Sequence, residues 1–136
     1  MAIVVDASVT LAWCFLDEAT EATWSVLDEV RDGGGITPAI WPLEVSNAML
    51  RGQGRGRLSA AAAAQFVELI EMLPIQVEPL TIHRALGPIR SLAQTHSLSA
   101  YDASYLELAM REGMSLATGD ERLRQAAAAV GVSLLP

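Results

Sequence analysis

The stretch of sequence that decides the fold runs from Leu98 to Asp120 and reads LSAYDASYLELAMREGMSLATGD. Its apolar residues recur at the spacing of one face of an α-helix. These residues are Tyr101, Tyr105, Leu108 and Ala109. Gly113 ends this helix, and Ser115 to Thr118 is short, bounded by turn residues and apolar in its middle, which predicts a buried strand. The stretch therefore predicts a helix, a reversal of the chain and a strand.

Two aspartates stand at defined places in this unit. Asp102 lies in the first turn of the predicted helix, and Asp120 lies just beyond the predicted strand. From Asp102 to Glu112 the helix rises about 15 Å at 1.5 Å per residue. About four extended residues then return roughly 13 Å. We therefore expect both aspartates at the same end of the unit, where two neighbouring acids form a candidate metal or acid–base site.

Length and composition predict a single globular domain over residues 1–136, because 51% of the residues are hydrophobic. No apolar run is long enough for a membrane span, and the opening MAIVVDAS has neither the basic region nor the cleavage pattern of a signal peptide. Cys14 is the only cysteine, which excludes a disulfide within the chain and suits a reducing compartment. We therefore expect a cytoplasmic protein without a membrane segment.

The charged residues exclude several kinds of chemistry. The formal net charge is −7, which argues against a protein that binds nucleic acid by basic charge alone. All nine basic residues are arginines, so the chain has no lysine for a phosphate-binding P-loop or a Schiff base. It also has no lysine to complete the pocket of a phospho-acceptor aspartate.

The whole chain alternates predicted strands with one or two predicted helices. Such alternation is typical of a parallel sheet with helices on both faces. We expect strands at 2–5, 36–39, 75–77, 115–118 and 132–135, and helices near 8–15, 19–31, 42–50, 59–72, 81–96, 98–112 and 121–130. Ser8 or Thr10 is expected to cap the first helix, and the RGQGRGR segment at 51–57 is expected to break the third. A bend is expected near Gly87 and Pro88.

Four carboxylates are expected at one edge of this sheet, because ligands of parallel sheets bind outside the carboxyl ends of the strands. These are Asp6, Glu44, Asp102 and Asp120. Acids so placed repel one another and stay ionised together only if cations compensate them. Oxygen ligands without cysteine or paired histidine select a hard cation, Mg²⁺ or Mn²⁺. Such a site can activate water for phosphodiester hydrolysis.

Each of these residues also has a purely structural interpretation, and spacing alone leaves both open. Asp102 and Asp120 suit helix caps, and Glu44 suits a first helical turn. Ser8 and Thr118 lie within local reach of Asp6 and Asp120, where they could equally form turn or capping hydrogen bonds. The three arginines of the 51–57 segment could contact RNA or an acidic partner, or could be a solvated helix end. They are Arg51, Arg55 and Arg57.

Four ordered segments of the chain resemble the PIN-domain ribonucleases, and most closely the VapC-type toxins of bacterial toxin–antitoxin pairs. The matching segments are VVDAS with Asp6 and Ser8, PLEVSNAML with Glu44, SAYDASYLELA with Asp102, and LATGDERLRQAA with Thr118 and Asp120. Each segment is short, but together they span nearly the whole chain in the order and spacing of that family. The absence of lysine departs from many RNA-binding surfaces, so arginines would have to replace it.

The resemblance implies a three-layer α/β/α sandwich with a mostly parallel sheet, and an endoribonuclease that depends on Mg²⁺ or Mn²⁺. It implies that the four acids form the catalytic and metal-binding quartet, with Ser8 and Thr118 supporting it. It further implies a homodimer, an RNA substrate that is commonly tRNA, and a cognate VapB-type antitoxin that blocks the site.

Two other functions fit parts of the sequence. An aspartate after the first strand also suits a phosphoaspartyl phosphatase or receiver, but the required lysine and a second aspartate beside Asp6 are absent. A non-catalytic interaction module with a PIN-like fold, in which the acids only cap helices, is the other alternative. Trapping of a phosphoaspartate and binding of Mg²⁺ distinguish these alternatives from the nuclease.

Overall fold

A four-stranded sheet forms the centre of the molecule, of which the computed structural model describes residues 2–136. The strands are β1 (Ile3–Val5), β2 (Gly35–Thr37), β3 (Ile75–Val77) and β4 (Leu116–Ala117). Their order is β3-β2-β1-β4, and every neighbouring pair is parallel. Val4 of β1 is paired with Ile36 on one side and Leu116 on the other. β1 and β4 are therefore neighbours, although 110 residues separate Val5 from Leu116 in the chain.

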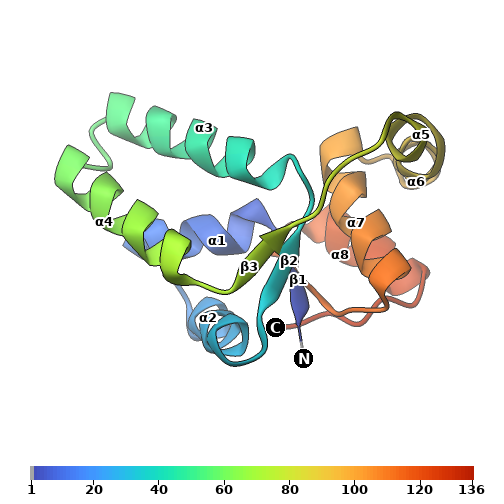
Figure 1. Ribbon diagram of the computed structural model, residues 1–136, viewed down its shortest axis with the longest axis horizontal. Coiled ribbons are helices and arrows are strands. Elements are labelled where there is room, and N and C mark those ends of the chain that lie inside the picture. Colours follow the sequence, from blue (N-terminus) through green and yellow to red (C-terminus); the bar gives the residue numbers. More distant parts are fainter. Residues whose placement is uncertain (1) are drawn as a thin grey trace.

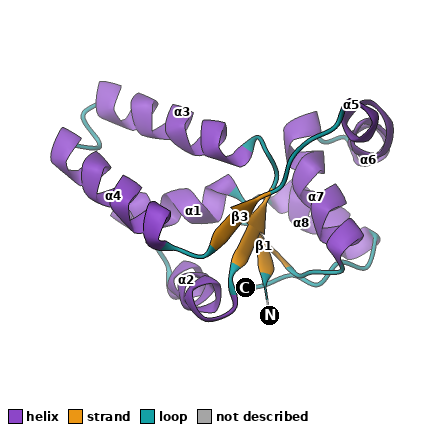
Figure 2. Ribbon diagram, viewed as in Figure 1, coloured by secondary structure: helices purple, strands orange, loops and turns teal. Residues whose placement is uncertain are grey.

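Helices cover both faces of this sheet (Figures 1 and 2). α1 to α4 lie on one side and α5 to α8 on the other. The helices are α1 (Ala7–Cys14), α2 (Glu21–Gly33), α3 (Trp41–Gly54), α4 (Ala60–Met72), α5 (Ile82–Arg84), α6 (Arg90–His96), α7 (Ala100–Glu112) and α8 (Glu121–Ala129). A π-helical turn, Ala85–Ile89, joins α5 to α6 and contains Pro88. The three-layer α/β/α sandwich with a parallel sheet is confirmed. Where a bend was expected near Pro88, the helix passes through this π-helical turn.

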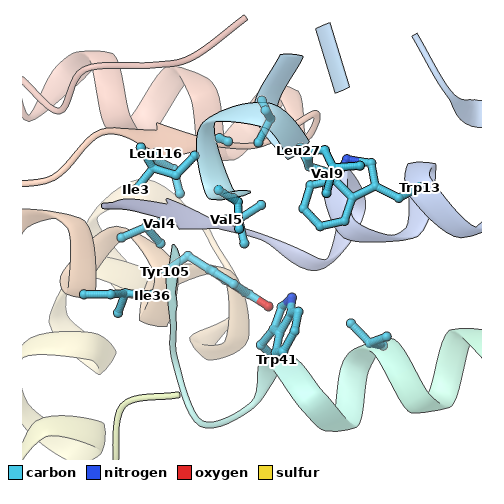
Figure 3. Close-up of a cluster of buried hydrophobic side chains, with 14 of the residues drawn as sticks. Ile3, Val4, Val5, Val9, Trp13, Leu27, Ile36, Trp41, Tyr105 and Leu116 are labelled. Atoms are coloured by element: carbon cyan, nitrogen blue, oxygen red, sulfur yellow. The ribbon is translucent and has the colours of Figure 1, made fainter. Parts of the chain in front are cut away.

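The core lies between the sheet and its two helical layers (Figure 3). Val4, Val5 and Leu116 are fully buried because helices cover the sheet on both faces. α7 packs against β1 and β4 and also against α6 and α8. For this reason its residues from Ala103 to Ala109 are all buried, rather than one stripe of them. The prediction that Tyr101 lies on the buried face is wrong, since its side chain is 60% exposed in the first turn of α7.

The start of α1 differs from the prediction that Ser8 or Thr10 caps it. Asp6 is the capping residue, because its backbone is extended and its carboxylate accepts a hydrogen bond from the Val9 amide at 3.0 Å. The Thr10 hydroxyl instead donates to the Asp6 carbonyl oxygen at 2.8 Å. Asp6 therefore has a structural role in addition to any chemical one.

The other elements differ from their predicted bounds by a few residues. α2 begins at Glu21 behind a Thr20–Thr23 capping box, and Ser59 caps α4 as expected. The predicted closing strand at 132–135 is reduced to a single bridge between Leu116 and Leu134. Among residues 2–136, none of the helices has the length and apolar content needed to cross a membrane.

The expected break of the third helix within 51–57 is confirmed, but α3 ends at Gly54 rather than near residue 50. Gly52 lies inside the helix and faces the Phe15 ring. A Cβ atom added at Gly52 would lie 2.6 Å from that ring. The glycine therefore permits close packing between α3 and the segment after α1, and it does not end the helix.

We expect Gly52→Ala to destabilise the protein by about 1–3 kcal/mol, because the new methyl group must displace the Phe15 ring. Gly54→Ala is the matched control: it lies in the same helix, and a Cβ atom there would meet nothing within 4 Å. Alanine is the better helix former, so this control should be neutral or slightly stabilising. Urea unfolding of both variants measures the difference, and equal stabilities would contradict the packing argument.

Candidate active site

The four predicted acids lie at the carboxyl edge of the sheet, each on a different element. Asp6 directly follows β1, and Asp120 follows β4 after two residues. Glu44 lies in the first turn of α3, the helix after β2, and Asp102 lies in the first turn of α7. β1 and β4 are paired, so Asp6 and Asp120 leave neighbouring strands on the same side.

Asp6 is the most deeply buried of the four, with 5% of its surface exposed. Its Oδ1 atom accepts hydrogen bonds from the Val9 amide and, at 2.6 Å, from the Ser8 hydroxyl. Its Oδ2 atom accepts one from the Thr118 hydroxyl. Both oxygens are thus held in place by groups from α1 and from the residue that follows β4.

Ser8 and Thr118 connect the two strand ends. The Gly119 amide donates to the Ser8 hydroxyl oxygen at 3.0 Å, and the Asp120 amide donates to the Thr118 hydroxyl oxygen at 3.0 Å. Each hydroxyl therefore contacts the Asp6 carboxylate and also the loop that carries Asp120. This network fixes Asp6 relative to Asp120 by hydrogen bonds rather than by chain connection.

Glu44 has a partner that the sequence did not suggest. The Tyr105 hydroxyl of α7 donates to its Oε1 atom at 2.6 Å. Tyr105 is only 1% exposed and was predicted solely as a packing residue. Figure 3 shows its ring passing through the core with the oxygen directed toward the start of α3, beside Trp41. A tyrosine on the buried face three residues after an acid of the cluster is the signal that could have identified it.

Asp102 and Asp120 differ in their local roles. Asp120 caps α8, since its Oδ1 atom accepts from the Leu123 amide at 2.9 Å. Asp102 does not cap α7, because the Ser99 hydroxyl accepts from the Asp102 amide in that role. The capping interpretation therefore holds for Asp120 and fails for Asp102.

The acids are close enough to influence one another's charge. Burial, and then repulsion from Asp102, raises the pKa of Asp6 despite its three hydrogen bonds. Burial raises the pKa of Glu44 as well, with added repulsion from Asp102 and Asp6. Burial and the neighbouring charge of Asp120 raise the pKa of Asp102. Asp102 thus lies within charge range of all three of the other acids. The sequence predicted its proximity to Asp120 from the reversal of the chain between them.

This donor set suits a hard divalent cation. All the donors are carboxylate oxygens, and each shifted acid carries unfavourable repulsion that a cation would relieve. No three His, Cys, Asp or Glu side chains within residues 2–136 are already gathered tightly enough to enclose an ion. The fit is therefore to an ion held by a few carboxylates with water completing its shell, as Mg²⁺ prefers.

The three arginines of the 51–57 segment are not equivalent. Arg57 donates to Asp17 at 3.1 Å and to Glu18 at 2.9 Å, and its guanidinium lies 4.4 Å from the centroid of the Phe15 ring. A 3₁₀ turn, η1 (Leu16–Glu18), follows α1. Arg57 is therefore paired with acids of this turn. Arg51 and Arg55 have exposed side chains, and of these two only Arg51 lines a cavity that also includes Glu44.

We expect Tyr105→Phe to destabilise the protein at pH 7 by about 1.5–3 kcal/mol, because it removes a hydrogen bond to a charged carboxylate. The Tyr105 hydroxyl also lowers the pKa of Glu44, so the pKa of Glu44 should rise further in this variant. Thermal unfolding and NMR titration of the Glu44 carboxyl measure the two effects. Tyr101→Phe, which removes an exposed hydroxyl from the same helix, should change neither.

The protein has an α/β/α sandwich fold with acids that converge at the carboxyl edge of a parallel sheet. Comparison of its sequence with family models identifies the family. The sequence model of the PIN domain matches residues 3–129. The chain therefore belongs to the PIN domain family. A search of curated proteins finds no match to this chain.

Solved structures with the same fold include three from different organisms. PAE2754 from Pyrobaculum aerophilum has a TM-score of 0.71 at 23% identity, over 93% of this chain and 84% of that one. FitAcB from Neisseria gonorrhoeae has a TM-score of 0.61 at 20% identity, over 100% and 97%. VapBC2 from Rickettsia felis, bound to a DNA fragment from their promoter, has a TM-score of 0.66 at 10% identity, over 98% and 97%. These similarities show that the fold is shared.

Proposed function

We propose that this chain is an endoribonuclease that depends on Mg²⁺ or Mn²⁺ and acts as the toxin of a toxin–antitoxin pair. The observation that carries the proposal is the position of Asp102. Its carboxylate has no capping role, yet it lies within charge range of Asp6, Glu44 and Asp120. Membership of the PIN domain family supports nuclease chemistry at this edge.

Asp6 and Asp102 are the first ligands that we assign to the cation, with Glu44 and Asp120 completing the site directly or through water. The cation supplies Lewis-acid activation of water and of the phosphodiester. The protein's own contribution is orientation. Ser8 and Thr118 hold the two Asp6 oxygens, and Tyr105 holds one Glu44 oxygen. The lone pairs of these carboxylates that are not hydrogen-bonded would therefore be available to a cation without rearrangement of the side chains.

A phosphoaspartyl mechanism receives no support from the site. A phospho-acceptor aspartate needs a lysine to stabilise its phosphorylated form, and the chain has none. A second aspartate beside Asp6 is also absent, because Ala7 and Ser8 follow it.

The proposed partners are a VapB-type antitoxin and a second copy of the chain. The similar VapBC2 structure from Rickettsia felis is bound to a promoter fragment. This chain has a net charge of −7, so contact with DNA would fall to a partner protein. Several large apolar side chains are exposed and offer area for protein contacts: Leu16, Leu43, Leu50, Met72, Ile82 and Leu86. We place the protein in the cytoplasm, where an RNA substrate such as tRNA is present.

Cleavage of RNA by the purified chain tests the proposed function. Total RNA and isolated tRNA are incubated with the protein in Mg²⁺, in Mn²⁺ and in excess EDTA, and the products are sized on a denaturing gel. We expect discrete fragments with either ion, none with EDTA, and recovery when the ion is restored. Absence of cleavage by a folded protein whose melting temperature does not respond to Mn²⁺ would favour the non-catalytic module.

A further inference from the structure

A second feature lies beside the acid cluster. It is a cavity of about 330 Å³ with Glu44 in its wall, and its other lining residues are not among the acids assigned to the cation. The other lining residues are Ile40, Leu43, Asn47, Arg51 and Tyr101. Because α3 supplies most of the wall and α7 supplies Tyr101, the cavity spans the gap between the helices that carry Glu44 and Asp102.

The residues of α3 that follow Glu44 form a track along one side of the helix. Asn47 and Arg51 come three and seven residues after Glu44, which places them one and two turns further along nearly the same face. The helix rise carries Arg51 about 10 Å from Glu44 along the axis. A phosphate bound by Arg51 would therefore be farther along a strand than the phosphate at the acids.

The positive charge of Arg51 is not paired with an acid in the described residues. No ion pair or side-chain hydrogen bond involves it within residues 2–136, whereas Arg57 contacts two acids. The chain carries 16 acids and nine arginines, so pairing partners are plentiful. An unpaired guanidinium beside a cluster of acids suits an anionic ligand that bridges the two.

Tyr101 supplies an aromatic surface at the same place. It directly precedes Asp102 and is 60% exposed, and Leu43 in the same wall is 67% exposed. An exposed aromatic ring beside a positive charge is the arrangement on which bases of single-stranded nucleic acid stack. The exposed amide of Asn47 adds donors and an acceptor that can contact a base edge.

We propose that this cavity binds one nucleotide of a single-stranded RNA substrate, next to the phosphodiester held at the acids. The base stacks on Tyr101, the Asn47 amide contacts its edge, and Arg51 binds a neighbouring phosphate. The inference rests on the proposed nuclease function and adds a substrate-binding role that the four acids do not supply. It also explains how a chain of net charge −7 without lysine contacts RNA.

Equilibrium binding separates this proposal from catalysis. A fluorescein-labelled single-stranded RNA dodecamer of mixed sequence is titrated with the protein in EDTA, so that no bond is cleaved, and anisotropy is recorded at several salt concentrations. We expect Tyr101→Ala to weaken binding about 5- to 100-fold, and Tyr101→Phe to bind as the wild type does. Arg51→Ala should lower the slope of log K against log salt by about 0.7.

Arg55→Ala is the matched control, because it removes an exposed arginine that does not line the cavity. Its effect should be clearly smaller than that of Arg51→Ala. The melting-temperature response to Mn²⁺ should be the same in Tyr101→Ala as in the wild type, which shows that the acids are intact. If the wild type and the variants bind RNA as expected but none of them cleaves it, the nuclease proposal is overturned and the subsite is not.

Two results overturn the subsite. The first is a wild-type protein that does not bind the RNA, and the second is Tyr101→Ala or Arg51→Ala binding with wild-type affinity. If the Tyr101→Ala variant keeps its RNA affinity but its sedimentation changes, the surface is assigned to a contact between protein chains.

Discussion

Asp102→Asn is expected to abolish RNA cleavage, by roughly 10²–10³-fold or more, while leaving the protein folded and at least as stable as the wild type. The loss follows because Asp102 is the acid that interacts with each of the other three, and removing a preorganised charged group at a reacting phosphate costs about this much. The retained stability follows because Ser99 caps α7 without the Asp102 carboxylate, and because the substitution removes repulsion.

Two other variants make this expectation specific. Asp32→Asn changes the charge by the same amount on an exposed residue of α2 and should leave cleavage unchanged. Asp6→Ala should also abolish cleavage, but it additionally removes the cap of α1 and should cost about 0.5–2 kcal/mol of stability. Single-turnover cleavage of a labelled RNA and urea unfolding measure both properties. An Asp102→Asn variant that cleaves at the wild-type rate would refute the assignment of the site.

The sequence predicted the fold where the local signals and the packing agree. Gly113 and Ser59 end and begin helices as expected, since their local conformations satisfy the helix ends without help from distant residues. The parallel sheet followed from the alternation of elements. The strand at 132–135 was overpredicted, because an apolar segment pairs as a strand only as far as a neighbour lies beside it.

Errors occurred where contacts distant in the sequence determine a residue's role. Gly52 belongs to the segment predicted to break the third helix, but it lies inside α3, where the ring of Phe15, 37 residues earlier, leaves no room for a Cβ atom. Tyr101 and Tyr105 have the same spacing signal, yet one is exposed and the other is buried against Glu44, which is 61 residues away in the chain. Arg57 looked equivalent to Arg51 until the structure showed its ion pairs with Asp17 and Glu18.

The stability of the metal-free protein is expected to fall as pH rises above the ordinary carboxyl range. Asp6, Glu44 and Asp102 have pKa values raised above their ordinary values of 3.8 for aspartate and 4.5 for glutamate, mainly by burial. The native state therefore binds their protons more tightly than the unfolded state does. This contribution to stability is complete below about pH 4 and is lost as pH rises through the native-state pKa values.

A divalent cation should reverse this loss. At pH 7.5 the ionised acids bind Mn²⁺ in the native state only, so a concentration 100 times the dissociation constant would stabilise the protein by about 2.7 kcal/mol. At pH 4 protons compete for the same oxygens, and the stabilisation should be small. Melting temperatures with and without Mn²⁺ at the two pH values measure the effect. NaCl at matched ionic strength controls for screening of charge.

Asp102→Asn identifies which acids cause the effect. This variant lacks the carboxylate that repels both Asp6 and Glu44, so its metal-free stability should depend less on pH than that of the wild type. It should also gain less from Mn²⁺, because one of the assigned ligands is absent. If the wild type and the variant respond equally to Mn²⁺, the ion binds elsewhere on this acidic chain. An unchanged difference in stability between them from pH 4 to pH 7.5 would show that Asp102 does not share its charge with the cluster.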